Sequence, residues 1–230
     1  PGFAHEIAVI IREGVRCMVE EQEDVFYYIS VMNESYPQPG LKPGQESGIL
    51  KGMYLLQEGD RDLPHRVQLL GSGTITHEML SAVDLLKDDW NVAADIWSVT
   101  SFTMAAREGN DTERWNMMHP GEEPRIPYVT ECLKNTSGPI VASTDYVRLF
   151  AEQIRAYIPE GRLYTVLGTD GFGRSDTRAN LRRFFEIDRY YVTLAALEAL
   201  VKTGEMPAGT VSDAIEKYGI DREKPNPVDM

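Results

Sequence analysis

Residues 67–99, VQLLGSGTITHEMLSAVDLLKDDWNVAADIWSV, contain the pattern that decides the fold. The apolar run at 67–70 predicts a buried strand, and apolar residues then recur at helical spacing from Ile75 to Leu86. A second strand is predicted around residues 94–99. The order strand, helix, strand indicates a βαβ unit, which is the building block of a parallel sheet.

The alternation continues on the carboxyl side of this unit. The expected elements are helices through Trp115 and over 128–133, strands at 140–142 and 163–167, and three final helices around 181–185, 194–201 and 210–219. Repeated alternation favours a mostly parallel sheet with helices on both faces. The predicted fold class is therefore α/β, and the closing segment DREKPNPVDM is expected to be frayed.

Another helix is predicted between the strands at 140–142 and 163–167. Ser143 or Thr144 can cap its start, and Asp145 complements the helix dipole there. Its buried stripe is expected to consist of Val147, Phe150, Ile154 and Tyr157.

The first 48 residues show a different pattern. A helix is expected over residues 4–19, with a buried face made of Ile7, Ala8, Ile11, Val15, Met18 and Val19. Residues 25–32, VFYYISVM, predict a mostly buried strand, because β-branched and aromatic residues suit a pleated sheet. The prolines and glycines of 33–48 predict a linker or a long ordered loop. One helix and one strand cannot enclose a core, so residues 1–45 are expected to be a domain tail plus linker, and residues 46–230 a second domain.

Composition excludes several classes of protein. The formal net charge of −13 over 230 residues repels phosphate backbones and argues against nucleic-acid binding. Cys17 and Cys132 have no CxxC spacing, which argues against a disulfide framework and favours a reducing cytoplasm. No apolar run approaches the roughly 18–20 residues that span a bilayer. Because the chain begins at Pro1 rather than Met, we expect a fragment of a longer chain.

Two glycine-rich turns follow predicted strands, where backbone amides can face an anion. The first, Gly71 to Gly73, lacks a third glycine and a Lys-Ser or Lys-Thr pair, so an ordinary turn is favoured. The second, Gly168 to Asp176, is more informative. Its candidate binding or interface residues are Asp170, Arg174, Ser175 and Asp176. Arg174 can hold a carboxylate through two hydrogen bonds, whereas Asp176 is equally well explained as a helix cap.

The four histidines show no metal-ligand spacing, and none accompanies a recognisable nucleophile motif. His119 lies beside Trp115 in a proline-rich loop that could position it for proton transfer, although a packed loop histidine is favoured. The acidic run from Glu20 to Asp24 is better explained by a solvated helix end than by a cation site. No metal-binding or cofactor-binding residue is expected in this chain.

Several long strings resemble the homodimeric pyruvate dehydrogenase decarboxylating component. They are FYYISVMNESYPQPG at 26–40, DIWSVTSF at 95–102, ERWNMMHP at 113–120, VASTDYVRLFAEQIRAYIP at 141–159, GTDGFGRSD at 168–176 and the later DAIEKYGID. Because these strings occur in order along nearly the whole chain, the resemblance is far more specific than any single glycine motif.

The resemblance implies a transketolase-like plan, in which residues 1–45 close a pyrimidine-binding domain and residues 46–230 form a transketolase carboxy-terminal-domain-like fold. It also implies a homodimeric parent enzyme that uses thiamine diphosphate and Mg2+ to decarboxylate pyruvate. The acetyl group then passes to a lipoyl group of the dihydrolipoyl acyltransferase. In the family, the metal site and the principal catalytic residues lie upstream of Pro1, so no catalytic residue is expected here.

Three functions are compatible with these observations. The first is a structural domain that supports the dimer and shapes the entrance to the active site, without catalysis of its own. The second is a module that binds a partner or a small regulator through the loop around Asp170 or through His119. The third is a free-standing nucleotide-binding domain of flavodoxin-like type, which is disfavoured because the glycine turns lack the accompanying acidic or lysine residues.

Overall fold

The computed structural model describes all 230 residues and contains one five-stranded sheet. Its strands, in spatial order, are β1 (Tyr54–Gln57), β3 (Val92–Ser98), β2 (His65–Gly71), β4 (Ile140–Ser143) and β5 (Tyr164–Leu167). Only β1 runs antiparallel to its neighbour, and the other three pairings are parallel. The predicted α/β fold class is confirmed.

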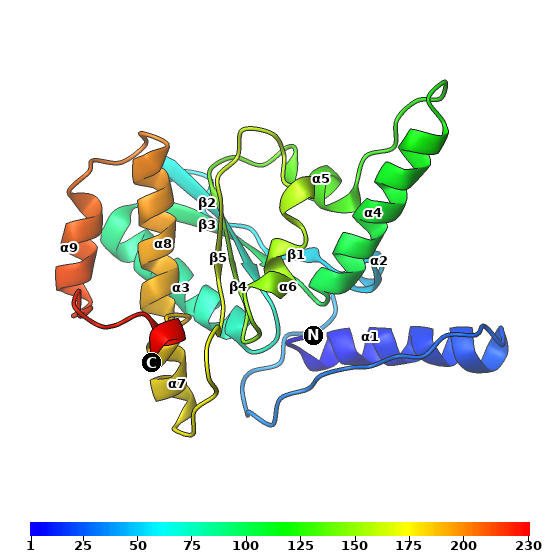
Figure 1. Ribbon diagram of the computed structural model, residues 1–230, viewed down its shortest axis with the longest axis horizontal. Coiled ribbons are helices and arrows are strands. Elements are labelled where there is room, and N and C mark those ends of the chain that lie inside the picture. The colour runs from blue at the N-terminus through cyan, green and yellow to red at the C-terminus, as the bar shows by residue number, and fades with distance from the viewer.

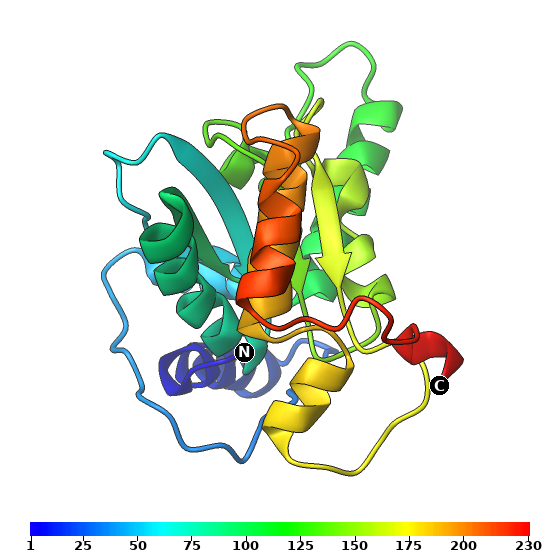
Figure 2. The same ribbon diagram turned by 90° about the vertical axis from the view of Figure 1, so that its left-hand side faces the viewer.

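Helices cover both faces of the sheet (Figures 1 and 2). On one face lie α3 (Ile75–Trp90), α8 (Arg189–Lys202) and α9 (Thr210–Lys217). On the other lie α4 (Phe102–Met118), α5 (Tyr128–Leu133), α6 (Leu149–Glu152) and the 3-10 turn η2 (Arg155–Tyr157). The helix α7 (Arg178–Phe184) lies beyond the end of the sheet (Figure 1).

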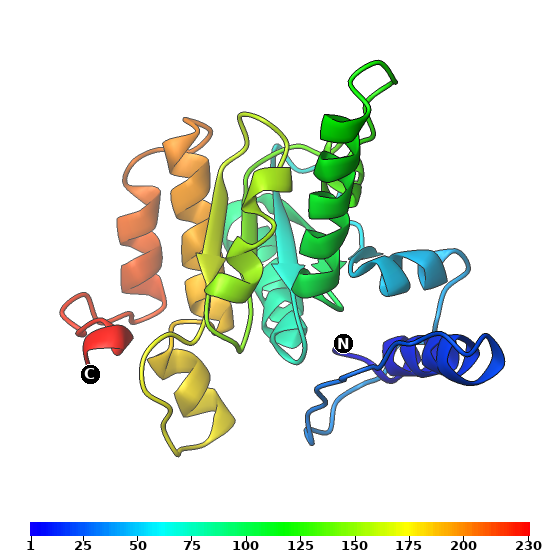
Figure 3. The same ribbon diagram turned by 45° about the vertical axis from the view of Figure 1, so that its right-hand side comes forward.

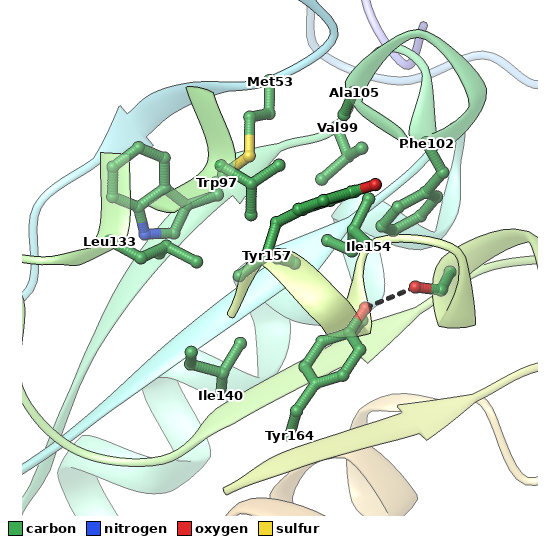
Figure 4. Packing of buried hydrophobic residues seen from close by; sticks show 14 of the residues in the cluster. Met53, Trp97, Val99, Phe102, Ala105, Leu133, Ile140, Ile154, Tyr157 and Tyr164 are labelled. Carbon is green, nitrogen blue, oxygen red and sulfur yellow. Dashed lines mark hydrogen bonds between the residues drawn. The ribbon is translucent and has the colours of Figure 1, made fainter. Parts of the chain in front are cut away.

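Each face of the sheet has its own hydrophobic core. On the α4 side, Trp97 and Ile140 pack with Phe102 and Tyr157, and the Tyr164 hydroxyl donates to the Ala151 carbonyl at 2.7 Å (Figure 4). Burying each large apolar side chain in these cores contributes roughly 1.5–3 kcal/mol relative to leaving it exposed. The alternation of side chains along buried strands therefore stabilises two helix layers at once.

The amino-terminal arm, defined here as residues 1–44, lies outside this sheet (Figures 1 and 3). It comprises α1 (Ala4–Val15), a single π-helical turn η1 (Arg16–Glu20) and an extended chain that runs back along α1. The sheet domain, residues 45–230, begins with α2 (Gln45–Lys51). The expected linker is thus irregular up to Gly44, but its last residues are helical.

The predicted buried face of the first helix is wrong. Ile11 and Val19 are 51% and 63% exposed, whereas Glu6 and Val9 are buried. Glu6 faces the sheet domain because its carboxylate accepts hydrogen bonds from the Tyr54 hydroxyl at 2.8 Å and the Ser98 hydroxyl at 2.5 Å. These hydrogen bonds orient α1, and its apolar stripe is left in solvent.

The strand predicted at residues 25–32 is also wrong. The segment is extended but pairs with no other strand, and Phe26 and Tyr28 are 88% and 89% exposed. A strand needs a neighbour that accepts and donates its backbone hydrogen bonds. No strand of this chain lies beside it, so its β propensity has no effect on the structure.

The helix predicted between β4 and β5 is interrupted. Only α6 and η2 form, and Val147 and Phe150 are exposed, whereas Ile154 and Tyr157 are buried as expected. Thr144 does not cap a helix, because its hydroxyl oxygen accepts from Ser72 Oγ at 2.8 Å and from the Tyr146 amide at 3.3 Å. These bonds close a turn and delay the helix start.

Several smaller features also differ from expectation. The sequence patterns did not predict β1 or α2, both of which are short. Gly209 rather than Thr210 precedes the first turn of α9, so Thr210 is not the cap. The closing segment forms a 3-10 turn, η3 (Pro227–Asp229), in which Pro227 is buried and the Asn226 side chain caps the turn.

Candidate functional site

The strongest candidate site is a pocket at the carboxyl edge of the sheet. The parallel strands β2, β4 and β5 all end at this edge, where ligands of open α/β sheets commonly bind. The pocket has a volume of about 300 Å³. Its polar lining consists of Thr74, Asp145, Thr169, Arg174, Arg178 and Arg182, and apolar walls come from helices α3 and α7 and from Met32 of the arm.

The glycines of the 168–176 loop are required by close backbone contacts. A Cβ at Gly168 would lie 2.7 Å from the Arg148 amide nitrogen. Gly171 has φ +105°, and a Cβ there would lie 2.8 Å from the Pro227 carbonyl oxygen. The loop therefore fits between the start of α6 and η3.

Asp170 fixes the same loop instead of facing the pocket. Its carboxylate accepts a hydrogen bond from the Arg148 backbone amide at 3.0 Å and forms an ion pair with the Arg148 guanidinium. Both charges of this pair are therefore already matched. The structure gives Asp170 the role of holding the loop against α6.

The three pocket arginines have different partners. The partly buried Arg182 donates to the Glu34 carboxylate at 2.6 Å, to the Glu78 carboxylate at 3.2 Å and to Thr74 Oγ1 at 3.3 Å. Arg178 lies 3.7 Å from the Glu34 carboxylate. Arg174 forms no ion pair, and its guanidinium carbon lies 4.3 Å from the centre of the Phe184 ring. Arg174 is thus the pocket cation that is free to bind an anion.

Glu78 anchors the inner side of this arrangement. Besides Arg182, its carboxylate binds the side chain and backbone amide of Arg189, both at 3.0 Å. Burial acts to raise the pKa of the Glu78 carboxyl, but the hydrogen bonds and charge of Arg189, followed by the charge of Arg182, outweigh it and lower that pKa. Glu78 is therefore ionised and links α3, α7 and α8.

Asp176 and Ser175 lie on the loop but do not line the pocket. Asp176 accepts hydrogen bonds from the Asn180 side chain at 2.8 Å and the Thr177 amide at 2.6 Å, which lower the pKa of its carboxyl. The cap of α7 is Thr177, whose hydroxyl accepts from the Asn180 amide. Asp176 precedes that cap, so its interpretation as the cap is wrong by one residue. Ser175 is exposed.

The structure does not bring His119 to the pocket. It ends α4 at the far side of the molecule, where that helix projects from the sheet domain (Figures 1 and 3). Its ring stacks on Trp115 with centroids 4.3 Å apart, and Nδ1 lies 2.8 Å from the Trp115 carbonyl oxygen. Since a carbonyl only accepts, Nδ1 carries the proton and donates it. His119 is therefore held by its own helix.

Sequence reasoning missed most of the pocket. Asp145 lies two residues after the end of β4, and Arg174, Arg178 and Arg182 are spaced by four residues, so both signals were visible in the sequence. The contribution of Glu34 had no such signal, because it comes from the arm, more than a hundred residues away from these arginines in sequence.

A second hollow of about 260 Å³ lies between β5 and the helices α8 and α9. Its only charged lining residue is Glu198, and its walls are mainly apolar. This hollow offers few groups that could orient a polar ligand. The pocket at the carboxyl edge is therefore the better candidate.

The structure contains neither a metal-binding cluster nor a membrane-spanning helix. No group of three or more His, Cys, Asp or Glu side chains is arranged to hold a metal ion, and Cys17 and Cys132 are free thiols. None of the helices is both long enough and apolar enough to cross a membrane.

Two family models match the chain. The transketolase-like TK C-terminal domain matches residues 52–188, and the pyruvate dehydrogenase E1 component middle domain matches residues 1–39. Among curated relatives, the pyruvate dehydrogenase E1 components of Pseudomonas aeruginosa and Escherichia coli (strain K12) are 57% and 51% identical over 229 and 230 residues. These alignments cover 100% and 99% of this chain but 26% and 25% of the relatives, so the chain spans about a quarter of their length.

Solved structures give a more distant likeness. Transketolase from Leishmania mexicana is 18% identical, with a TM-score of 0.46 over 70% of this chain and 20% of its own. The fold class therefore rests on the strand order and direction of the sheet itself.

Proposed function

The chain belongs to the transketolase-like C-terminal domain family, in the form found in pyruvate dehydrogenase E1 components, and from this premise we propose that its role is structural. It supports the dimer of a longer parent enzyme and shapes the entrance to that enzyme's active site. Residues 1–45 complete a pyrimidine-binding domain, and residues 46–230 form the carboxy-terminal domain. No catalytic step is assigned to any residue of this chain.

The observation that carries this proposal is the apolar surface of the arm. Its exposed apolar side chains are Ile11, Val15, Met18, Val19, Val25, Phe26, Tyr27, Tyr28, Val31 and Met32. So many exposed large apolar side chains within one short segment are characteristic of a protein interface. The match of residues 1–39 to a middle domain supports the view that the remainder of that domain and the dimer partner cover this apolar surface.

The arm is held to the sheet domain at the edge where the pocket lies. Glu34 binds Arg182, and the Tyr146 hydroxyl donates to Ser30 Oγ at 2.6 Å. Through these contacts the sheet domain fixes the orientation of the arm, and hence of the domain that the arm completes. The Thr169 amide donates to the Tyr146 carbonyl at 2.9 Å, so the 168–176 loop braces one of these contacts, which supports a positioning role for the loop.

For the parent enzyme we propose thiamine-diphosphate-dependent decarboxylation of pyruvate, followed by transfer of the acetyl unit to a lipoyl group of the dihydrolipoyl acyltransferase. Thiamine diphosphate, bound with Mg2+, supplies the electron sink for decarboxylation. Since no group of three or more metal-binding side chains is found in this chain, we place the cofactor site in the remainder of the parent chain.

The first test compares this chain with the full-length parent. Both are given pyruvate, thiamine diphosphate and Mg2+, decarboxylation is measured, and cofactor binding is followed by calorimetry. We expect turnover by the parent and neither turnover nor cofactor binding by this chain. Turnover by this chain would contradict the proposal and require a catalytic site among these residues.

The second test addresses the interface in the full-length enzyme. We expect Phe26→Ser to raise the dimer dissociation constant about tenfold or more, because roughly 1.5–3 kcal/mol of apolar burial is lost. The control Leu149→Ser changes a residue that is 70% exposed on the sheet domain and should leave the constant unchanged. The dimer dissociation constants are measured by analytical ultracentrifugation. Equal dissociation constants for the two variants would contradict the dimer-supporting role.

The entrance role has its own test. Arg174→Ala and Asp176→Ala in the full-length enzyme should slow acetyl transfer to the lipoyl group. If activity, dimerisation and acetyl transfer were all unchanged, the loop would have no part in the entrance.

A partner-binding module is the second candidate, favoured by the projecting end of α4. Met117 and Met118 are 71% and 58% exposed there, next to His119. Exposed methionines suit adaptable protein interfaces. Titration of the full-length enzyme with the acyltransferase core, with and without Met117→Ser, tests this role, and equal affinities would remove it.

A further inference from the structure

The pocket at the carboxyl edge contains a cation without a protein partner. Arg178 and Arg182 both pair with Glu34, and Arg182 also pairs with Glu78, whereas Arg174 pairs with no carboxylate. The Phe184 ring beneath Arg174 holds its guanidinium without using its hydrogen-bond donors. A planar guanidinium with free donors is the group best suited to a carboxylate or phosphate.

Two further polar groups of the pocket have capacity left for a ligand. The Thr74 hydroxyl oxygen accepts from Arg182 at 3.3 Å, so its own proton is available to a second acceptor. Asp145 lines the same pocket and forms no ion pair with any of the three arginines. Burial raises the pKa of the Asp145 carboxyl.

The remaining walls favour a small molecule with an apolar part. Ile75, Leu181, Phe185 and Ile187 contribute apolar side chains, and the volume of about 300 Å³ lies at the lower end of the range for ligand pockets. Gly173 borders the opening, and a Cβ built on it would have no atom within 4 Å. A side chain introduced at Gly173 would therefore meet no neighbouring atom at its Cβ.

We propose that this pocket binds a small organic anion, a phosphate monoester or a dicarboxylate, whose charged group is held by Arg174 and Thr74 while its carbon skeleton lies against α3 and α7. The site adds ligand binding to a chain for which no catalytic step is proposed. Since Arg178 and Arg182 line the same pocket and hold Glu34, the bound anion lies beside the contact between the arm and the sheet domain.

The test uses the full-length enzyme with saturating thiamine diphosphate and Mg2+, so that a phosphate probe does not report the cofactor site. Phenyl phosphate and succinate are titrated separately by calorimetry. Arg174→Gln should weaken binding by about tenfold or more, the loss expected for a charge-assisted hydrogen bond. The matched control Arg114→Gln removes an exposed arginine of α4 and should leave binding unchanged.

A second pair of variants separates charge from shape. Gly173→Glu and Gly173→Gln place side chains of similar size at the opening, where neither meets a neighbouring atom at Cβ. We expect the glutamate variant to bind several-fold more weakly than the glutamine variant, because its carboxylate repels the anion.

Each outcome decides the proposal. Tighter binding of phenyl phosphate assigns the site to phosphate monoesters, and tighter binding of succinate assigns it to dicarboxylates. No binding of either probe to the wild type would overturn the proposal. Equal affinities for wild type and Arg174→Gln, or equal losses in Arg174→Gln and Arg114→Gln, would overturn it as well. None of these readouts depends on dimerisation or acetyl transfer.

Discussion

Two segments that the sequence predicts as strands have opposite fates in this protein. Residues 25–32, VFYYISVM, consist mostly of β-branched and aromatic residues that suit a sheet, whereas strand β3, VAADIWS, contains fewer of them. All of β3 is buried, and it lies between the antiparallel strand β1 and the parallel strand β2. The arm segment pairs with no strand, and its Phe26 side chain is 88% exposed. A strand is stabilised by its neighbours, so propensity alone cannot decide whether it forms.

The largest effect is expected at the centre of the sheet domain. Leu69→Ala removes a fully buried side chain of β2, and it should lower the free energy of unfolding by about 3 kcal/mol through lost burial and a residual cavity. Urea unfolding followed by circular dichroism measures this change. A loss below about 1 kcal/mol would mean that the core is far looser than its burial indicates.

A smaller loss is expected where α3, α7 and α8 meet. Glu78→Gln removes a buried charge, leaves the partly buried Arg182 without one of its two carboxylates and should lower the free energy of unfolding by about 2 kcal/mol. The variant Glu198→Gln, which breaks an exposed pair with Lys202, should change stability by less than about 0.5 kcal/mol. Equal losses in the two variants would contradict the anchoring role of Glu78.

The same carboxylate predicts a pH dependence. Because the pKa of Glu78 is lowered by folding, its contribution is fully present above the unfolded-state value of about 4.3. The contribution is lost as the pH falls through the lower folded-state pKa. Stability should therefore fall less between neutral and acidic pH in Glu78→Gln than in the wild type. Parallel curves for the two proteins would show that Glu78 does not titrate in this way.

The contact between the amino-terminal arm and the sheet domain should contribute less to stability than the Glu78 cluster. Glu34→Gln removes the ion pairs with Arg178 and Arg182 and should cost about 1 kcal/mol or less, since Glu34 is partly exposed. Hydrogen exchange of the arm should become faster while exchange in β2 and β3 stays the same. The control Glu46→Gln breaks the exposed pair with Arg12 and should leave exchange near residue 34 unaltered.

The smallest effect is expected in the arm segment itself. Phe26→Ala in this chain should change the free energy of unfolding by less than about 0.5 kcal/mol, because the side chain is already in solvent. Its contrast with Leu69→Ala tests the comparison directly. A loss above 1 kcal/mol would show that the arm packs in solution against a surface of the same chain.

The candidate site was only partly visible in the sequence. The loop from Gly168 to Asp176 does border the pocket, since Thr169, Gly173 and Arg174 line it. Asp170 and Asp176, chosen for their charge, instead satisfy nearby backbone groups and side chains. His119 lies at the end of a different helix. Charge and spacing identify which groups can bind a ligand, but neither shows which of them are already occupied by protein partners.

By itself the sequence determined the α/β class, because the helical and strand periods of residues 67–99 are local properties of the chain. It also determined the irregular chain near residues 33–44, where prolines and glycines exclude regular structure. Only the tertiary structure decided which face of α1 is buried, since the hydrogen bonds of Glu6 to Tyr54 and Ser98 join segments far apart in sequence. The tertiary structure likewise decided that Arg182 is paired and that Arg174 is free. Glu34 and Glu78 reach Arg182 only after the arm and α3 have folded against α7.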